Sequence, residues 1–152
     1  MGYLLHLFIL QIKLRKGLWG EKMASFGKSS LEQLATCDPD IQKVFNEVIK
    51  YFDCKVIQGH RGRAEQHKAY LDGKSKVDWP NGKHNSLPSK AVDVMPYPID
   101  WNDIQRLCYF AGFVMCTALR MGIKLRWGKD WDGDTDLNDQ NFNDGPHFEK
   151  VG

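Results

Sequence analysis

The sequence predicts an α+β domain in which a small, mostly antiparallel sheet packs helices on one face. Two observations lead to this class. Apolar stripes at helical spacing come first in the chain, and short apolar strands then interleave with one long helix. In addition, 152 residues that are 42% hydrophobic and 26% charged can bury one core but not two. We therefore expect one domain at 23–152, preceded by an extension at 1–22.

Two helices are expected at the start of this domain. Ser29 and Ser30 offer hydroxyl groups that can cap a short first helix. Asp38 and Pro39 are typical of the cap and the first position of the next helix. Apolar residues then recur at helical spacing through 41–52, which predicts a buried stripe.

A strand, a short helix and a long loop follow. The run 55–58 is typical of a strand, and 64–71 predicts a helix that Gly73 closes. The polar segment 74–90 is expected to be a loop, and the apolar run 91–95 a strand.

The C-terminal part is expected to contain one long helix and two strands. Asp100 is expected to cap the helix and Gly122 to end it. Strands are expected at 123–127 and 146–151, joined by an acidic loop. The buried face of the helix is expected to carry Ile104, Leu107, Cys108, Ala111, Val114, Met115, Ala118 and Leu119.

Charge and cysteine content exclude some classes of protein. A net charge of +2 argues against a dedicated nucleic-acid-binding protein. The four cysteines form no C-x-x-C pair, which argues against a zinc ribbon. We expect free thiols, with disulfides as the open alternative. Cys108 and Cys116 are expected to be buried in the long helix.

The extension at 1–22 differs from the rest of the chain. Its apolar run 3–12 precedes the charges of Lys13, Arg15 and Lys16, which is the wrong order for a secretory signal. The run is also too short to span a bilayer. It is either a weak anchor to a membrane surface or, as we favour, an extension that is disordered or that arises from an upstream start codon.

The candidate metal-binding and catalytic residues lie in two separate segments of the sequence. His84 and Asp93 flank the end of the polar loop, and Asp144 stands three residues before His147. Two histidines and an aspartate are a ligand set that leaves zinc one open position for water. Asp93 lies in an apolar strand, where an unpaired carboxylate is costly to bury and a metal ion removes that cost. We therefore expect a zinc site in a cleft on the sheet face opposite the helices.

These motifs resemble the zinc peptidases that cut bacterial cell-wall peptides. The pattern of that family is S-x-H, then A-x-D, then [DE]-x-x-H, and the resemblance covers about 25–149. The family includes D-alanyl-D-alanine carboxypeptidases and L-alanyl-D-glutamate endopeptidases. The sequence resembles most the phage endolysin branch of the endopeptidases. There are two departures: the eight residues between His84 and Asp93 make a longer gap, and Gly82 and Lys83 provide no serine. Further matches to that branch are Gly59-His60-Arg61, Gln66, Trp79-Pro80, Pro88-Ser89, Ala91-Val92-Asp93-Val94, Pro96-Tyr97, Gly122-Ile123 and Arg126-Trp127-Gly128.

The resemblance implies roles for individual residues. It makes Asp144 the general base that takes a proton from the attacking water. Glu149 competes for this role, but it lies two residues after His147 on a strand and is ranked as a partner of that histidine. Arg61 is expected to stabilise the oxyanion, with Arg63 as its rival.

Further predictions concern the lining of the cleft and the acidic loop. Gln66 is expected to contact substrate or support its helix, and Trp127 to line the cleft together with Trp79 and Tyr97. Alternating aspartates from Asp130 to Asp139 suggest calcium, although no EF-hand frame fits, and a solvated loop is the equal alternative.

The expected function is therefore that of a zinc metallopeptidase acting on the peptidoglycan stem peptide. L-alanyl-D-glutamate cleavage in endolysin-like lysis is favoured. The alternatives are D-alanyl-D-alanine carboxypeptidase activity and a non-catalytic zinc domain that binds the cell wall. We expect a monomer with no nucleic-acid partner and no firm membrane association. It would be made in the bacterial cytoplasm from a phage or prophage gene and act on the wall after release.

Overall fold

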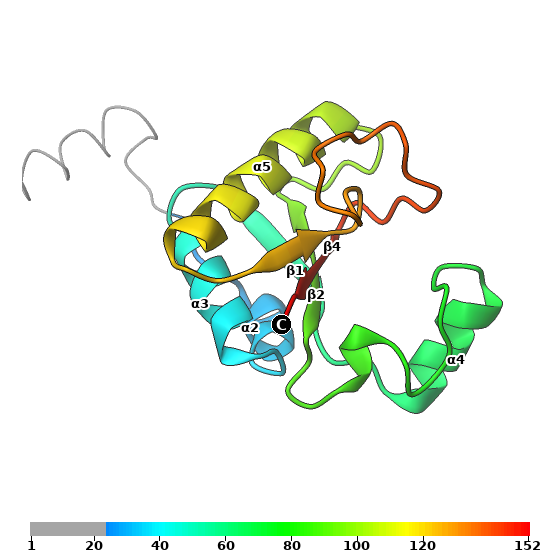
Figure 1. Cartoon of the computed structure of the whole chain (residues 1–152). Coiled ribbons are helices and arrows are strands. Elements are labelled where there is room, and N and C mark those ends of the chain that lie inside the picture. Colours follow the sequence, from blue (N-terminus) through cyan, green and yellow to red (C-terminus); the bar gives the residue numbers. More distant parts are fainter. Residues whose placement is uncertain (1–23) are drawn as a thin grey trace, which may run out of the picture.

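A computed structural model describes residues 24–152, so the predictions for 1–22 lie outside the described part of the chain. The helices are α2 (Lys28–Leu34), α3 (Pro39–Val48), α4 (Arg63–Leu71) and α5 (Ile104–Arg120), with a short 3-10 helix η1 (Lys83–Asn85). The strands are β1 (Cys54–Gln58), β2 (Ala91–Pro96), β3 (Leu125–Trp127) and β4 (His147–Lys150) (Figure 1). Each expected element is therefore present, and η1 adds one turn within the expected loop.

The four strands form one antiparallel sheet in the order β1-β2-β4-β3. Its register sets Val92 opposite Phe148 and Asp93 opposite His147. Because successive side chains of a strand point to opposite faces, one face is apolar and the other polar. This pattern confirms the predicted α+β class with a small antiparallel sheet.

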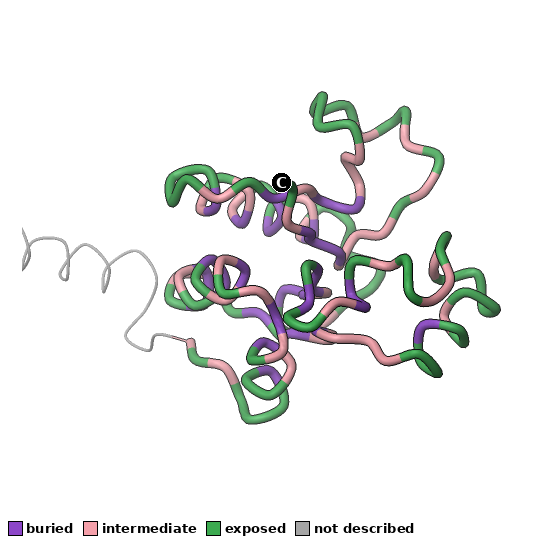
Figure 2. The backbone as a smooth tube through the Cα atoms, turned by 60° about the horizontal axis from the view of Figure 1, so that its bottom comes forward, coloured by how far each residue is buried: buried purple, intermediate pink, exposed green. Residues whose placement is uncertain are grey.

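The helices α2, α3 and α5 cover the apolar face. Phe148 of β4 packs its ring 5.6 Å from Phe45 of α3 and 6.2 Å from Phe110 of α5, between ring centroids. Figures 1 and 2 show these helices on one side of the sheet, with α4 and the loop before β4 on the other. The polar face of the sheet therefore opens towards α4 and that loop.

The long helix α5 departs from its prediction at both ends. Its cap is Asp103, whose carboxylate accepts a 3.0 Å hydrogen bond from the Arg106 backbone, whereas Asp100 caps the preceding turn. Ile104 is 46% exposed and Leu119 is 78% exposed, because they lie in the terminal turns beyond the buried line of α5. Phe110, absent from the predicted face, is fully buried instead.

The cysteines and the last two strands agree with the predictions only in part. All four cysteines are free, as expected, but Cys116 is exposed because it lies outside the buried line of α5. The last two strands are shorter than predicted, because pairing begins only at Leu125 and His147. Within residues 24–152, no helix is long and apolar enough to cross a membrane.

Candidate metal centre

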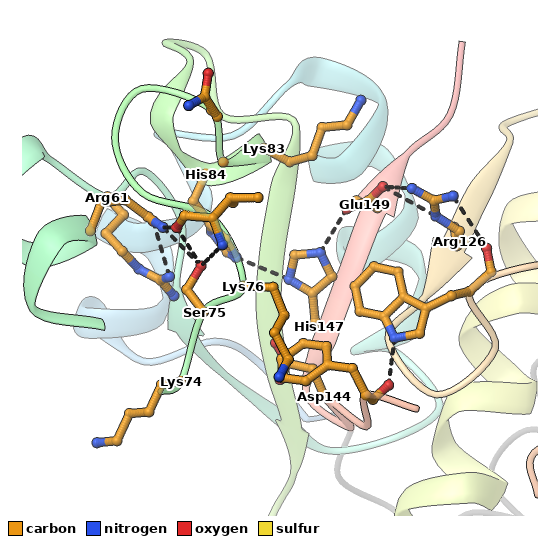
Figure 3. A pocket seen from close by; sticks show the side chains of 16 residues that line it. Arg61, Lys74, Ser75, Lys76, Lys83, His84, Arg126, Asp144, His147 and Glu149 are labelled. Carbon is orange, nitrogen blue, oxygen red and sulfur yellow. Dashed lines mark hydrogen bonds and ion pairs between the residues drawn. The ribbon is translucent and has the colours of Figure 1, made fainter. Parts of the chain in front are cut away.

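Three side chains from separate elements converge on the polar face of the sheet. His84 comes from η1, Asp93 from β2 and His147 from β4 (Figure 3). Nε2 of His84 lies 3.1 Å from Nδ1 of His147 and 3.2 Å from Oδ1 of Asp93. That carboxylate oxygen lies 3.3 Å from Nδ1 of His147. The antiparallel register brings together residues that are 54 positions apart in the sequence.

This group could hold a metal ion, and its dimensions fit one of the size of zinc. Ligand atoms that bind zinc at about 2.0–2.1 Å in a tetrahedron lie about 3.3 Å from one another. The three observed separations of 3.1–3.3 Å agree with this value. The donors are two imidazole nitrogens and one carboxylate oxygen, a set that suits zinc and that would leave a fourth position for water.

A backbone contact fixes the ring of His84. Its Nδ1–H donates a 2.7 Å hydrogen bond to the carbonyl oxygen of Gly59, which leaves the Nε2 lone pair free for a metal. Gly59 itself approaches α2 closely, because a Cβ there would lie 2.2 Å from the carbonyl oxygen of Gln33 and from Oγ1 of Thr36. The end of β1 therefore requires glycine in order to hold His84.

The eight residues between His84 and Asp93, more than the family pattern has, form a loop that folds back on η1. The backbone nitrogen of Lys90 donates to the carbonyl of Lys83 at 3.0 Å and closes this loop. Gly82, at the position of the missing serine, donates from its backbone to Oδ1 of Asn85 at 2.8 Å. A Cβ at Gly82 would lie 2.8 Å from this oxygen, so the local packing disfavours a serine.

Glu149 fixes the ring of His147. Its carboxylate accepts a 2.9 Å hydrogen bond from Nε2 of His147, so that Nδ1 faces the other two candidate ligands. Arg126, opposite Glu149 in the β3–β4 register, pairs with the second carboxylate oxygen. No role for Arg126 at the site was predicted, because only the strand register identifies it as a partner of Glu149.

The pKa values of these groups reflect their mutual charges. Burial would raise the pKa of Asp93, but His84 and His147 hold it well below its usual range. Burial would lower the pKa of His147, but its hydrogen bonds to Asp93 and Glu149 raise it to about 9. Burial would raise the pKa of Glu149, but hydrogen bonds from His147 and Arg126 lower it to about 2. The imidazole lies between two carboxylates, an environment that stabilises a cation.

Asp144 lines the same cleft as the two histidines. Its backbone nitrogen donates to the carbonyl of Gly128 at 2.7 Å, and the Gly128 nitrogen donates to the carbonyl of His147 at 2.8 Å. A Cβ at Gly128 would lie 2.2 Å from the Asp144 carbonyl oxygen, so this approach also requires glycine. Burial, and then the charge of Asp93, raise the pKa of the Asp144 carboxylate, which makes it a better proton acceptor than an exposed aspartate.

Arg61 lies in the cleft beside Asp93. Its Nη2 donates to Oδ2 of Asp93 at 3.2 Å, and its Nη1 donates to Oε1 of Gln66 at 3.3 Å. Gln66 is only 1% exposed, and its amide also donates to Ser75, which makes it a support for the cleft wall. The rival Arg63 is exposed and does not line this cleft.

The cleft has a volume of about 370 Å³ and contains aromatic residues that were not predicted from the sequence. Trp131 and Phe142 line it, and the Trp131 ring lies 5.5 Å from that of His147, between centroids. Trp127, predicted to line the cleft, is instead 6% exposed in the hydrophobic core. Because Trp127 and Trp131 are only four residues apart, the path of the chain after β3 decides which of them lines the cleft.

Part of the acidic loop forms a second group of carboxylates. Asp130, Asp132 and Asp134 offer oxygen atoms within 4.8 Å of one another. One oxygen of Asp130 also accepts a 3.0 Å hydrogen bond from the backbone of Gly133, as in a self-stabilised turn. The loop contacts the candidate metal centre through Trp131, whose ring packs against that of His147.

Comparison with known proteins gives a consistent result. The sequence model of the phage L-alanyl-D-glutamate peptidase family matches residues 23–151. The L-alanyl-D-glutamate peptidase of Escherichia phage T5 is 34% identical over 134 residues, covering 83% of this chain and 97% of the phage protein. The crystal structure of the Serratia marcescens L-Ala D-Glu endopeptidase ChiX superposes with a TM-score of 0.67 at 26% identity, covering 84% of this chain and 90% of that one.

Proposed function

Because the chain belongs to the family of phage L-alanyl-D-glutamate peptidases, we propose that it is a zinc-dependent endopeptidase of peptidoglycan that cleaves the L-alanyl-D-glutamate bond. The ligands in this proposal are His84, Asp93 and His147. The observation that carries it is their convergence in a cleft that Asp144 also lines. We propose that the peptidase domain comprises residues 23–152.

In this mechanism, His84, Asp93 and His147 would hold the zinc ion, which would supply Lewis-acid chemistry for the scissile carbonyl and the attacking water. Asp144 takes a proton from the attacking water and passes it to the leaving amine. Arg61 donates to the developing oxyanion, using guanidinium N–H groups that its bonds to Asp93 and Gln66 leave available. Glu149 keeps the His147 ring in the tautomer that directs Nδ1 towards the metal.

The alternatives are a D-alanyl-D-alanine carboxypeptidase and a non-catalytic zinc domain that binds the cell wall. The phage relative is an L-alanyl-D-glutamate peptidase and the Serratia relative an L-Ala D-Glu endopeptidase, which favours cleavage between L-alanine and D-glutamate. The half-buried carboxylate of Asp144, which lines the cleft beside both histidines, favours catalysis over binding, because a wall-binding domain has no use for a proton acceptor there.

Mass spectrometry of purified peptidoglycan, after incubation with the zinc-loaded protein, tests the proposal. A new N-terminal D-glutamate is the expected product. Loss of a terminal D-alanine would assign the carboxypeptidase activity instead. Intact peptidoglycan, from protein shown to contain zinc, would leave the wall-binding domain as the function.

We propose a biological setting that suits this activity. The substrate partner is bacterial peptidoglycan, reached from the cytoplasm of a phage-infected or lysogenic cell after release by a pore or by lysis. A monomer suffices, because all the proposed groups come from one chain. Sedimentation of the purified protein checks this expectation.

The acidic loop has two interpretations that a calcium titration separates. Calcium bound by Asp130, Asp132 and Asp134 would raise the melting temperature of the protein in this titration. A solvated turn would leave both the melting temperature and activity unchanged.

A further inference from the structure

The cleft contains more positively charged side chains than pair with the carboxylates of the candidate metal centre. Its cationic lining residues are Arg61, Lys74, Lys76, Lys83 and Arg126. Arg61 pairs with Asp93, and Arg126 pairs with Glu149. The three lysines form no salt bridge with any residue of 24–152, and Asp144 is the remaining carboxylate of the lining. The cleft is therefore suited to a substrate that brings its own negative charge.

Lys76 differs from the other two lysines because it reaches across the cleft. Its ammonium nitrogen lies 5.1 Å from the centroid of the Phe142 ring, on the opposite wall. This cation–π contact holds the side chain over the cleft without neutralising its charge. In Figure 3, Lys76 extends towards Asp144, whereas Lys74 and Lys83 point away from it.

The buried side chain of Gln66 holds in place the two residues that flank Lys76. Gln66 donates from Nε2 to Oγ of Ser75 at 2.9 Å and to the carbonyl of Val77 at 2.6 Å. The hydroxyl of Ser75 in turn donates to the Val77 carbonyl at 2.8 Å. Since Gln66 is only 1% exposed, a rigid support presents the exposed lysine to the cleft.

The proposed substrate supplies a matching anion. The amine released by cleavage belongs to a glutamyl residue, which has two carboxyl groups. Only one of them can continue the peptide, so the other stands within a few bonds of the leaving nitrogen. Asp144, which delivers the proton to that nitrogen, would repel this carboxylate unless a cation lay on the same side.

We propose that Lys76 binds the free carboxylate of the glutamyl residue on the leaving side of the scissile bond and thereby determines the specificity of the cleft. This inference rests on the proposed endopeptidase function and adds a binding residue to it. Lys76 contributes a charge-assisted hydrogen bond. It also screens the substrate anion from Asp144.

The test compares two synthetic stem peptides that differ only at this group, one with the free carboxylate and one with the carboxamide. The zinc-loaded full chain is expected to cleave the carboxylate peptide with a kcat/KM about tenfold higher, the size of one charge-assisted hydrogen bond. Lys76→Gln should abolish this preference, mainly through KM for the carboxylate peptide. Lys76→Arg should retain it, because the positive charge is kept.

Lys55→Gln is the matched control, because Lys55 is an exposed lysine of β1 that does not line the cleft. It should leave the preference intact. A parent protein without preference, or a Lys76→Gln variant that retains it, would overturn the inference while cleavage itself upholds the endopeptidase function. Failure of the zinc-loaded parent to cleave either peptide would overturn the proposed function and this inference with it.

Discussion

Glu149 accepts a 2.9 Å hydrogen bond from Nε2 of His147, two residues before it on the same strand. The period of two in a β-strand puts both side chains on one face, so the candidate ligand and the carboxylate that supports it come from a single short segment. Arg126 completes the arrangement from β3. The orientation of the His147 ring therefore depends on a carboxylate that is itself held by a second strand.

Replacing Glu149 by glutamine should weaken zinc binding about 10–100-fold, because the His147 ring loses its anionic partner. Competition with a chromophoric chelator measures this affinity. Glu32→Gln, on the exposed surface of α2, is the control and should bind zinc like the parent. Equal affinity in the Glu149 variant would show that the carboxylate does not position the ligand.

Asp144→Asn should lower kcat by about 100-fold or more while zinc content stays unchanged, because the amide cannot accept a proton. Release of peptides from peptidoglycan gives the rate, and metal analysis gives the zinc content. Asp53→Asn, an exposed change outside the cleft, should have no effect. Full activity of the Asp144 variant would disprove the proposed base.

Gly59→Ala should destabilise the protein by about 1–3 kcal/mol, since the new Cβ would overlap backbone and side-chain oxygens of α2 at 2.2 Å. It should also weaken zinc binding, because the Gly59 carbonyl anchors His84. Urea unfolding and zinc titration measure the two effects.

The matched control for Gly59 is Gly112, an exposed glycine within α5 where an added Cβ would meet nothing within 4 Å. Gly112→Ala should stabilise the protein by about 1 kcal/mol, because alanine is the better helix former. Destabilisation by both substitutions would point to a general intolerance of alanine rather than to the contact at Gly59.

The stability of chelator-treated protein should depend on pH through His147. The pKa of this histidine is raised from 6.5 to about 9, so its stabilising contribution is complete below pH 6.5 and is lost as the pH rises through about 9. Urea midpoints measured between these values should therefore fall. Glu149→Gln should reduce the fall, because one of the hydrogen bonds that raises the pKa is weakened. A flat profile for the parent would contradict this account.

Local sequence patterns were sufficient to predict the helices and strands and to nominate candidate ligands. The apolar stripe of α3 and the cap of Asp38 involve neighbours in sequence, and both are found as expected. An aspartate in an apolar strand likewise indicates, by itself, that a buried charge needs a partner. Such signals are local because helix and strand periodicity arise within a few residues.

Contacts between distant segments decided the remainder. The register that sets Asp93 opposite His147, and Arg126 opposite Glu149, depends on pairing across the sheet, which no local periodicity encodes. The path of the chain after β3 likewise put Trp127 in the core and left Trp131 for the cleft. The sequence by itself determined the helices, the strands and the candidate residues for the chemistry. The tertiary structure decided which of these candidates meet, because strand register and loop path are set by the packing of the whole domain.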